Sequence, residues 1–305
     1  MCDVKKSQIE KSQLELSDNL DYTPKEEEDI RRVLEDKHLD VVFMATPDHW
    51  HAPATIMALD AGKHVYVEKP LAMTQQEAKD MIQISKKYNV KLMVGHLLQY
   101  HPIFEKMKSI IHEGELGKLD YIYSNRLSFG KIRSEEDVIW SFAPHDISMI
   151  LSLTKELPYK IKTNSSSILQ KGISDIATIH LDFKNGLKAH VSVSWLNPYK
   201  EQKITAICKK GMLVFDDTMQ WDKKLSLYKH IIELDDGMPS TIKADPIFIN
   251  VEEDEPLKRE CKYFIDLIDG NVKDRTDGIE GLRVLKVLTG ASESIANKCE
   301  VNIEL

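Results

Sequence analysis

The first third of the chain alternates short apolar runs with stretches of helical spacing. The apolar runs are residues 39–44 (LDVVFM), 64–68 (HVYVE) and 91–96 (KLMVGH). Residues 52–62 and 74–89 between them have the spacing of amphipathic helices, and the second helix opens on Thr74 with Glu77 in the capping-box position. Strands and helices in this order predict right-handed crossovers and a parallel sheet.

The pattern changes after about residue 115. A helix is expected over 101–114 with a stop at Gly114, and alternation of apolar and polar residues then predicts strands. These strands are expected at 121–129, 175–183, 187–195, 203–210, 212–217 and 224–234. Asn185-Gly186 lies between two of them and indicates a hairpin. Further helices are expected at 29–36, 145–157, 255–270 and 278–298.

The composition is that of a soluble globular protein, with 42% hydrophobic and 30% charged residues. The 41 basic residues against 49 acidic residues give a formal net charge of −8, which argues against non-specific nucleic-acid binding. The four cysteines form no CxxC pair, which favours reduced thiols in a cytoplasmic protein. No apolar run is long enough to cross a membrane, so no membrane partner is expected.

Three strand ends in the first part carry polar residues. The first strand is followed by residues 45–51 (ATPDHWH), the second by Lys69-Pro70, and the third ends at Gly95-His96. The carboxyl ends of parallel strands meet at one edge of a sheet, which is where ligands bind in such folds. The three ends are therefore expected to converge on one site.

Lys69 is the most informative residue of this group. Pro70 cannot donate a hydrogen bond to a neighbouring strand, so the strand should end there and leave Lys69 at the lip of the crevice. A Lys held beside an oxidised nicotinamide is suited to take the hydroxyl proton when a secondary alcohol is oxidised. The alternative is a solvated loop residue.

The segments ATPDHWHA, AGKHVYVEKPLA and APHDISMIL resemble the Gfo/Idh/MocA family of NAD(P)-dependent oxidoreductases, which act mainly on sugars and their derivatives. The resemblance runs from about Asp3 to the last helix. It implies an α/β protein, with an incomplete Rossmann-type parallel-sheet domain over residues 1–115. An α+β domain with a large open, mostly antiparallel sheet follows over 116–305, and the resemblance implies homodimers or homotetramers formed through this sheet.

The resemblance also implies roles for individual residues. Lys69 and His145 correspond to the catalytic residues. The cofactor-site residues it implies are Asp3, Ala45, Thr46, Pro47, His51, Glu68, Lys69 and His96. Asp3 would hold the adenosine ribose, which favours NAD over NADP as the cofactor.

His145 also has an interpretation from the residues alone. Pro144 before it fits the first turn of a helix, and a neutral His at a helix N-terminus can exchange a proton near neutral pH. The alternative is a capping or core His. Many family members carry an Asp four positions before this His, where this chain has Ser141, so Lys69 and His145 must carry proton transfer.

The segments GKIRSEEDVIWSFAPHDISMIL, SWLNPYKEQK and GMLVFDDT are similar to a branch that oxidises C3 of UDP-N-acetylglucosamine or its glucuronic acid form. The expected substrate-binding residues are Lys69, Arg126, Lys131, Trp140 and His145. Arg133, Lys200 and Lys203 are further candidates for an anionic diphosphate, although each could be a solvated charge. Trp195 and Tyr199 either line the sugar or uracil site or pack in the core.

The chain departs from the family at its start, because no glycine precedes Gly62 and the first strand with its G-x-G-x-x-G loop is missing. The loss leaves neighbouring strand edges unpaired. Three explanations remain: a shortened form of an active enzyme, which we favour; a short protein with a rearranged sheet and no cofactor; or a strand recovered from another chain.

Two further functions compete with a dehydrogenase. One is a glycosidase of the same family with tightly bound NAD, and the other is a non-catalytic member that uses its sheet for oligomerisation or partner binding. The histidines at 49, 51, 96 and 101 invite a zinc interpretation, but no Cys joins them and no carboxylate has a known ligand spacing, so no metal is expected.

Overall fold

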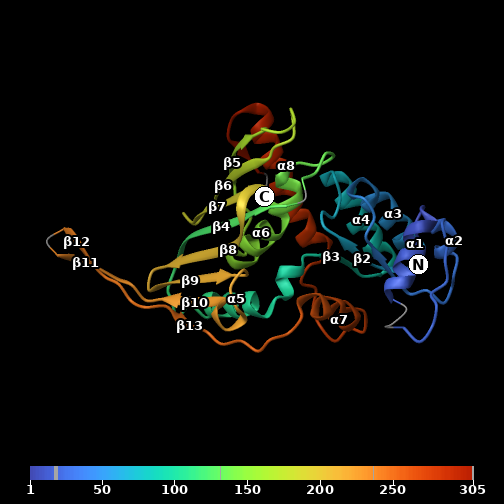
Figure 1. The fold of residues 1–305 in the computed structure, drawn as a ribbon, viewed down its shortest axis with the longest axis horizontal. Helices are drawn as coiled ribbons and strands as arrows, with labels where there is room; N and C mark the ends of the chain where they lie inside the picture. Colours follow the sequence, from blue (N-terminus) through green and yellow to red (C-terminus); the bar gives the residue numbers. More distant parts are fainter. Residues whose placement is uncertain (17–19, 131, 236, 304–305) are drawn as a thin grey trace. The chain divides into compact units, whose positions relative to one another are not determined.

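The computed structural model describes residues 1–16, 20–130, 132–235 and 237–303. The chain forms two compact units. The first contains Met1–Gly95 and Leu267–Gly278, and the second contains His96–Asp266 and Ile279–Leu305. Figure 1 gives the course of the chain through both units.

The first unit is built on a parallel sheet of order β1-β2-β3. Its elements are α1 (Lys6–Leu16), α2 (Ile30–Leu34), β1 (Val41–Met44), α3 (Asp48–Asp60), β2 (His64–Glu68), α4 (Gln75–Tyr88) and β3 (Leu92–Gly95). The predicted capping box is confirmed, because Thr74 Oγ1 accepts from Glu77 N–H and the Glu77 carboxylate accepts from Thr74 N–H.

β1 is an edge strand, which pairs within the described residues only with β2. Cys2 forms a separate parallel bridge with Glu27, and Phe43 in β1 is 50% exposed. Side chains of a strand point to the two faces of the sheet, so the face of β1 that carries Phe43 is partly open to solvent.

The second unit is dominated by a nine-stranded sheet of order β13-β10-β9-β8-β4-β7-β6-β5-β14. Its strands are β4 (Leu119–Phe129), β5 (Lys160–Ser166), β6 (Ile176–Asp182), β7 (Lys188–Ser194), β8 (Leu196–Cys208), β9 (Gly211–Asp216), β10 (Leu225–Tyr228), β13 (Ile247–Phe248) and β14 (Val301–Asn302). All pairings are antiparallel except β4 with β7, so the mostly antiparallel sheet is confirmed.

The remaining elements are helices, two short 3-10 turns and a small hairpin. They are η1 (Leu97–Tyr100), α5 (Pro102–Glu113), α6 (Val138–Thr154), η2 (Trp221–Lys223), β11 (Ile231–Asp235), β12 (Met238–Ile242), α7 (Pro256–Ile268) and α8 (Gly278–Asn297). The strand predicted over 224–234 is wrong as one element, because it divides into β10 and β11 and β11 pairs with β12 instead. Asn185-Gly186 forms the predicted hairpin, with Gly186 at φ 86°.

The core of the second unit lies between the sheet and α6. Alternate residues of β7, Ala189, Val191 and Val193, are buried with Ile147 and Ile150 of α6. The period of two in the strand and the apolar length of α6 explain why this helix lies on the sheet.

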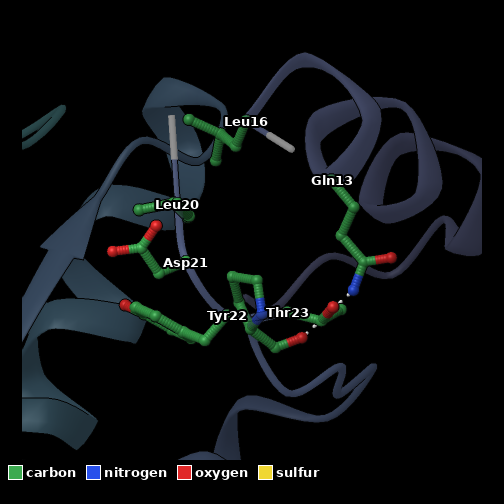
Figure 2. A pocket seen from close by; sticks show the side chains of 7 residues that line it. Gln13, Leu16, Leu20, Asp21, Tyr22 and Thr23 are labelled. Atoms are coloured by element: carbon green, nitrogen blue, oxygen red, sulfur yellow. Dashed lines mark hydrogen bonds between the residues drawn. The ribbon is translucent and has the colours of Figure 1, made fainter. Parts of the chain in front are cut away.

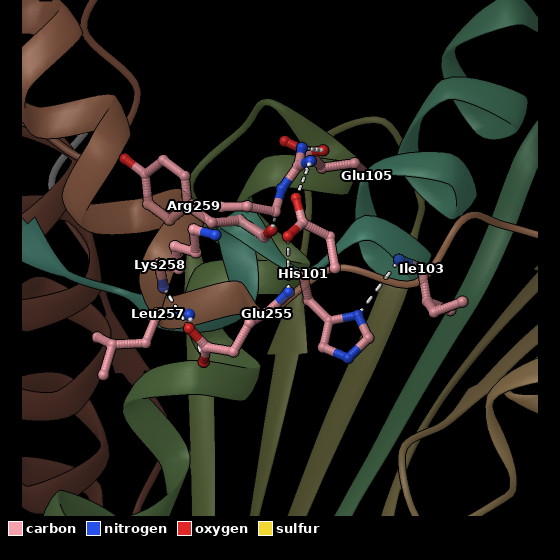
Figure 3. A network of polar contacts seen from close by, with 9 residues as sticks. His101, Ile103, Glu105, Glu255, Leu257, Lys258 and Arg259 are labelled. Atoms are coloured by element: carbon pink, nitrogen blue, oxygen red, sulfur yellow. Dashed lines mark hydrogen bonds and ion pairs between the residues drawn. The ribbon is translucent and has the colours of Figure 1, made fainter.

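Polar contacts join α5 and α7 at the edge of this core (Figure 3). His101 caps α5, since its Nδ1 accepts from Ile103 N–H. The Arg259 guanidinium of α7 contacts the Glu105 carboxylate, and its Nε donates to the Tyr100 carbonyl at 3.1 Å. Because Ile103 N–H occupies Nδ1, the other nitrogen of His101 carries the hydrogen that faces Asp217.

Asp217 is the acidic group of this region. Its Oδ1 lies 3.5 Å from His101 Nε2 and 2.5 Å from Lys224 Nζ. Burial raises the pKa of this carboxyl, but the hydrogen bonds from His101 and Lys224 outweigh burial and lower the pKa to about 2. The carboxylate is therefore the form that the folded state favours.

We expect Asp217→Asn to lower the free energy of unfolding by about 2 kcal/mol at neutral pH. The folded-state pKa lies below the usual aspartate value of 3.8, so this stabilisation is present above about pH 4 and is lost as the pH falls toward 2. Urea denaturation at pH 7 and pH 3 measures it. The exposed Asp222→Asn is the control, and equal losses for the two variants would contradict the prediction.

Candidate functional site

The three predicted strand ends meet at one edge of the first-unit sheet. β1, β2 and β3 are parallel and paired in register, with Met44 opposite Val67 and Glu68 opposite Gly95. Ligand sites of parallel sheets lie at this carboxyl edge. β2 is the central strand, so Lys69, which follows it directly, lies between the two flanking strand ends.

His51 ties two of these ends together. Its Nδ1 lies 2.6 Å from the Pro70 carbonyl oxygen and its Nε2 lies 2.8 Å from the Thr46 carbonyl oxygen. The residue is 1% exposed, so both nitrogens face these carbonyl oxygens inside the protein, and a ring with one N–H donates to one of them. These contacts link the loops after β1 and β2, and the expected contact of His51 with the cofactor stays a prediction.

Gly95 allows a close approach at the end of β3. A Cβ at this position would lie 2.6 Å from Tyr66 Oη and 3.1 Å from Glu68 Oε2. Tyr66 is buried and cannot move aside without cost. The absent side chain of Gly95 therefore defines where the Glu68 carboxylate lies at the strand edge.

The second-unit residues lie on and around α6, which corrects one expectation. α6 begins at Val138 with Asp137 as its N-cap, and Asp137 Oδ1 accepts from Ile139 and Trp140 N–H. Burial raises the pKa of the Asp137 carboxyl against the lowering effect of these two bonds. Pro144 and His145 consequently lie inside the helix, so the predicted helix start at Pro144 is wrong and the N-terminal dipole does not act on His145.

Arg126 of β4 pairs with the residue next to His145. Its Nε donates to Asp146 Oδ2 at 2.5 Å, and Ser124 donates to Asp146 Oδ1. Asp146 is 1% exposed and the Arg126 side chain is 12% exposed. The buried Asp146 carboxylate, which accepts from two side chains, fixes the position of the Arg126 guanidinium. Asp146 directly follows His145 in the chain.

The other predicted substrate residues have varied surroundings. Trp140 donates its indole N–H to Ser292 at 3.0 Å and packs against the core. Lys131 lies outside the described residues. Trp195 is fully buried and donates to Asp175, so core packing is the correct one of its two interpretations. Tyr199 is 62% exposed.

The other candidate cations are placed on the protein surface or paired. Lys203 contacts Asp216 at 3.0 Å, and Arg133 contacts Glu136 at 3.3 Å. Burial lowers the pKa of Lys203, but its contact with Asp216 outweighs this and raises the pKa. The roles of these cations toward a substrate stay predictions.

Glu280 lies beside His96, and no pattern in the sequence indicated this contact. Its carboxylate lies 2.5 Å from His96 Nδ1 and accepts from Ser148 Oγ at 2.6 Å. His96 and Glu280 are 184 residues apart in the chain. An acidic residue in the first turn of a helix is common, so only the fold identifies this one.

Other surface features add no site. Figure 2 shows a hollow in the first unit lined by Gln13, Leu16, Leu20, Asp21, Tyr22, Thr23 and Pro24. None of these is a predicted site residue. Within the described ranges, no group of three or more His, Cys, Asp or Glu side chains is arranged to hold a metal ion. Of the helices in those ranges, none combines the length and apolar character needed to span a bilayer.

Comparison with known families accounts for both units. Residues 4–96 match an oxidoreductase family with an NAD-binding Rossmann fold, named GFO_IDH_MocA, and residues 104–214 match the GFO/IDH/MocA C-terminal domain. The chain belongs to the Gfo/Idh/MocA oxidoreductase family. The expected family and fold class are thereby confirmed.

Relatives in this family include an uncharacterized oxidoreductase, YrbE, from Bacillus subtilis. It is 24% identical over 288 residues, which cover 90% of this chain and 82% of YrbE. Because the match covers most of both chains, the relationship extends over both units and not over one domain alone.

Solved structures share the fold. UDP-N-acetylglucosamine 3-dehydrogenase GnnA from Acidithiobacillus ferrooxidans has a TM-score of 0.81 and 20% identity, covering 96% of this chain and 88% of GnnA. The WlbA dehydrogenase from Bordetella pertussis, in complex with NADH and UDP-GlcNAcA, has a TM-score of 0.79 and 18% identity, covering 100% of this chain and 89% of WlbA. At these identities the similarity establishes the fold alone.

The strand-edge residues fit part of a dinucleotide. Thr46 Oγ1, just beyond the end of β1, is buried without a hydrogen-bond partner in the described residues, so this hydroxyl could form a hydrogen bond with a ligand. Asp3 follows a short bridged segment and accepts from Lys5 N–H at 2.7 Å.

We expect His51→Leu to lower the free energy of unfolding by about 1–3 kcal/mol, because an aliphatic side chain can donate to neither of the two buried carbonyls. The neighbouring His49 is exposed, so His49→Leu should change stability by less than about 0.5 kcal/mol. Thermal and urea denaturation of the two variants give the comparison. Similar losses would show that His51 does not hold the two loops.

Proposed function

We propose that this protein is an NAD-dependent dehydrogenase that oxidises a secondary alcohol of a sugar. The substrate is a UDP-linked N-acetyl hexose or hexuronate, oxidised at C3. The observation that carries the proposal is the position of Lys69, which follows the central strand of a parallel sheet between two other polar strand ends. The names of GnnA and WlbA support the substrate class.

The reaction requires two transfers from the substrate. A bound NAD would supply the acceptor for the hydride from the carbon atom. Lys69 Nζ accepts the hydroxyl proton as the C–O bond becomes a carbonyl, and His145 assists this transfer.

The chain's own residues also provide for binding. Thr46 and Asp3 are proposed to hold the cofactor, together with Ala45, Pro47 and Glu68 at the same strand edge. Arg126 is proposed to bind an anionic group of the substrate, because Asp146 fixes its Nε and the planar guanidinium then presents its remaining N–H groups in a set direction. We further propose a cytoplasmic homo-oligomer formed through the second-unit sheet.

NAD binding and turnover test this function. The purified chain is titrated with NAD and NADP by thermal shift and protein fluorescence, and then incubated with NAD and either UDP-N-acetylglucosamine or UDP-N-acetylglucosaminuronate. We expect binding of NAD and formation of NADH. A chain that binds neither nucleotide would overturn the proposal, and a chemically altered sugar without net NADH would indicate an internal redox cycle instead.

Lys69→Ala should lower kcat by about 10²–10⁴-fold, because the substrate hydroxyl loses its proton acceptor. Lys79→Ala in α4 is the matched control, since this side chain is exposed and distant in sequence from the strand end. NADH formation measures turnover, and circular dichroism checks that both variants fold. If Lys69→Ala turns over as fast as Lys79→Ala, Lys69 is not the acid-base residue.

A further inference from the structure

A buried chain of hydrogen bonds surrounds Glu280 in the second unit. His96 Nδ1 lies 2.5 Å from Glu280 Oε2, and Ser148 Oγ donates to Glu280 Oε1 at 2.6 Å. Gln99 Nε2 donates to the carbonyl oxygen and to Oγ of Ser148, each at 2.9 Å. The residues come from the end of β3, η1, α6 and the first turn of α8, and His96, Gln99 and Ser148 are at most 2% exposed.

The direction of each hydrogen bond in this cluster is fixed by chemistry. The Ser148 carbonyl only accepts, so the Gln99 amide must present its NH₂ group there, and Gln99 Oε1 then faces Lys108 Nζ at 3.4 Å. Ser148 accepts from Gln99 and donates to Glu280. An ionised carboxylate only accepts, so His96 must carry its hydrogen on Nδ1.

The position of Glu280 follows from the segment before it. In the first unit, Thr276 accepts from Val94 N–H of β3 at 2.7 Å, and Asp277 forms a bridge with Met93. A Cβ on Gly278 would lie 2.7 Å from Ile82 Cγ1, so only glycine fits where α8 begins. His96 directly follows β3, and Glu280 is two residues beyond Gly278. Both residues therefore follow backbone segments that are hydrogen-bonded to each other.

We propose that Glu280 is a positioning residue that holds His96 as the Nδ1–H tautomer and thereby makes Nε2 the atom that accepts a hydrogen bond from a ligand. This inference rests on the proposed function, because it takes His96 as a residue of the cofactor and substrate site at the strand edge. The ligand group is a hydrogen-bond donor, either the carboxamide of a nicotinamide or a hydroxyl of the sugar. Ser148 donates to the carboxylate, and Gln99 donates to Ser148.

The tautomer can be measured without a ligand. In ¹⁵N-labelled protein at alkaline pH, NMR distinguishes Nδ1–H from Nε2–H. Comparison with His96→Gln assigns the signals of His96 among the 11 histidines. We expect the Nδ1–H form in the wild type.

Glu280→Gln is the decisive variant, because its amide NH₂ can donate to Nδ1 and allow the Nε2–H form. We expect a mixture of tautomers or the Nε2–H form in Glu280→Gln. Glu293→Gln in α8 is the matched control, since Glu293 is exposed, and it should leave the tautomer unchanged. A wild-type Nε2–H tautomer, or the same tautomer in Glu280→Gln as in the wild type, would overturn the proposal.

Kinetics identify the ligand group. Loss of a residue that orients another functional residue typically costs about 10–100-fold, so we expect kcat/KM of Glu280→Gln to fall by at least about tenfold and that of Glu293→Gln to be unchanged. A rise in KM for NAD indicates the carboxamide, and a rise in KM for the sugar nucleotide indicates a hydroxyl. Unchanged kinetics in Glu280→Gln would overturn the role toward a ligand.

A second variant and the ligand-free measurement distinguish failure of the positioning role from failure of the proposed function. If Glu280→Gln does not fold, Ser148→Ala removes one of the donors that hold the carboxylate and should broaden or split the His96 signals. If the wild type binds no NAD and turns over no sugar, the proposed function fails, and with it the role of Nε2. The tautomer result would still decide whether Glu280 positions His96.

Discussion

The parallel pairing of β1, β2 and β3 is the constraint on which the first unit depends. β2 is the central strand, and Val65, Tyr66 and Val67 are at most 4% exposed. A strand buried to this extent cannot slip in register without moving polar residues into the core. The pairing of Glu68 with Gly95 therefore fixes where β2 ends and where Lys69 leaves the sheet.

The loops beyond the strands depend on a second level of contacts. His51 links the carbonyls of Thr46 and Pro70, while the missing side chain of Gly95 leaves space for Tyr66 and Glu68. Neither residue has to touch a ligand to act. Each limits the positions that neighbouring loop atoms can take, which is how a strand edge becomes a defined site.

The sequence was sufficient for the sheet, for the family and for the residues at the strand ends. Each of these depends on local signals, namely short apolar runs, the Thr74 capping box, the Asn185-Gly186 turn and the Pro70 stop. It was not sufficient for the start of α6. Pro144 is typical of a first helical turn, but Asp137 caps the helix and α6 begins at Val138, six residues before Pro144. The Val138 N–H donates to the Ser174 carbonyl of a distant loop, which no local pattern indicates.

Contacts between residues that are distant in sequence were also not predictable, because no local pattern indicates them. Asp146 with Arg126, and Glu280 with His96, join residues whose separation in sequence carries no period or motif. Propensity predicts that a carboxylate favours the first turn of α8, but not which imidazole it faces. Such pairs become visible only when packing brings their elements together.

Two buried polar residues of α6, Asp146 and Ser148, determine how this helix is rotated about its axis. Successive residues of an α-helix are about 100° apart, so Asp146 lies about 100° to one side of His145 and Ser148 about 60° to the other. Asp146 is bound by Arg126 and Ser124 of β4, and Ser148 is bound by Gln99 and Glu280.

Rotating α6 would break one of these buried sets and leave a polar group unpaired, at a cost of about 1–3 kcal/mol per group. The helix thus has one favoured rotation, and His145 faces the sector between the two sets. The direction of His145 is set by its polar neighbours and not by a helix terminus, so the helix can begin at Val138 and still present this side chain in one direction.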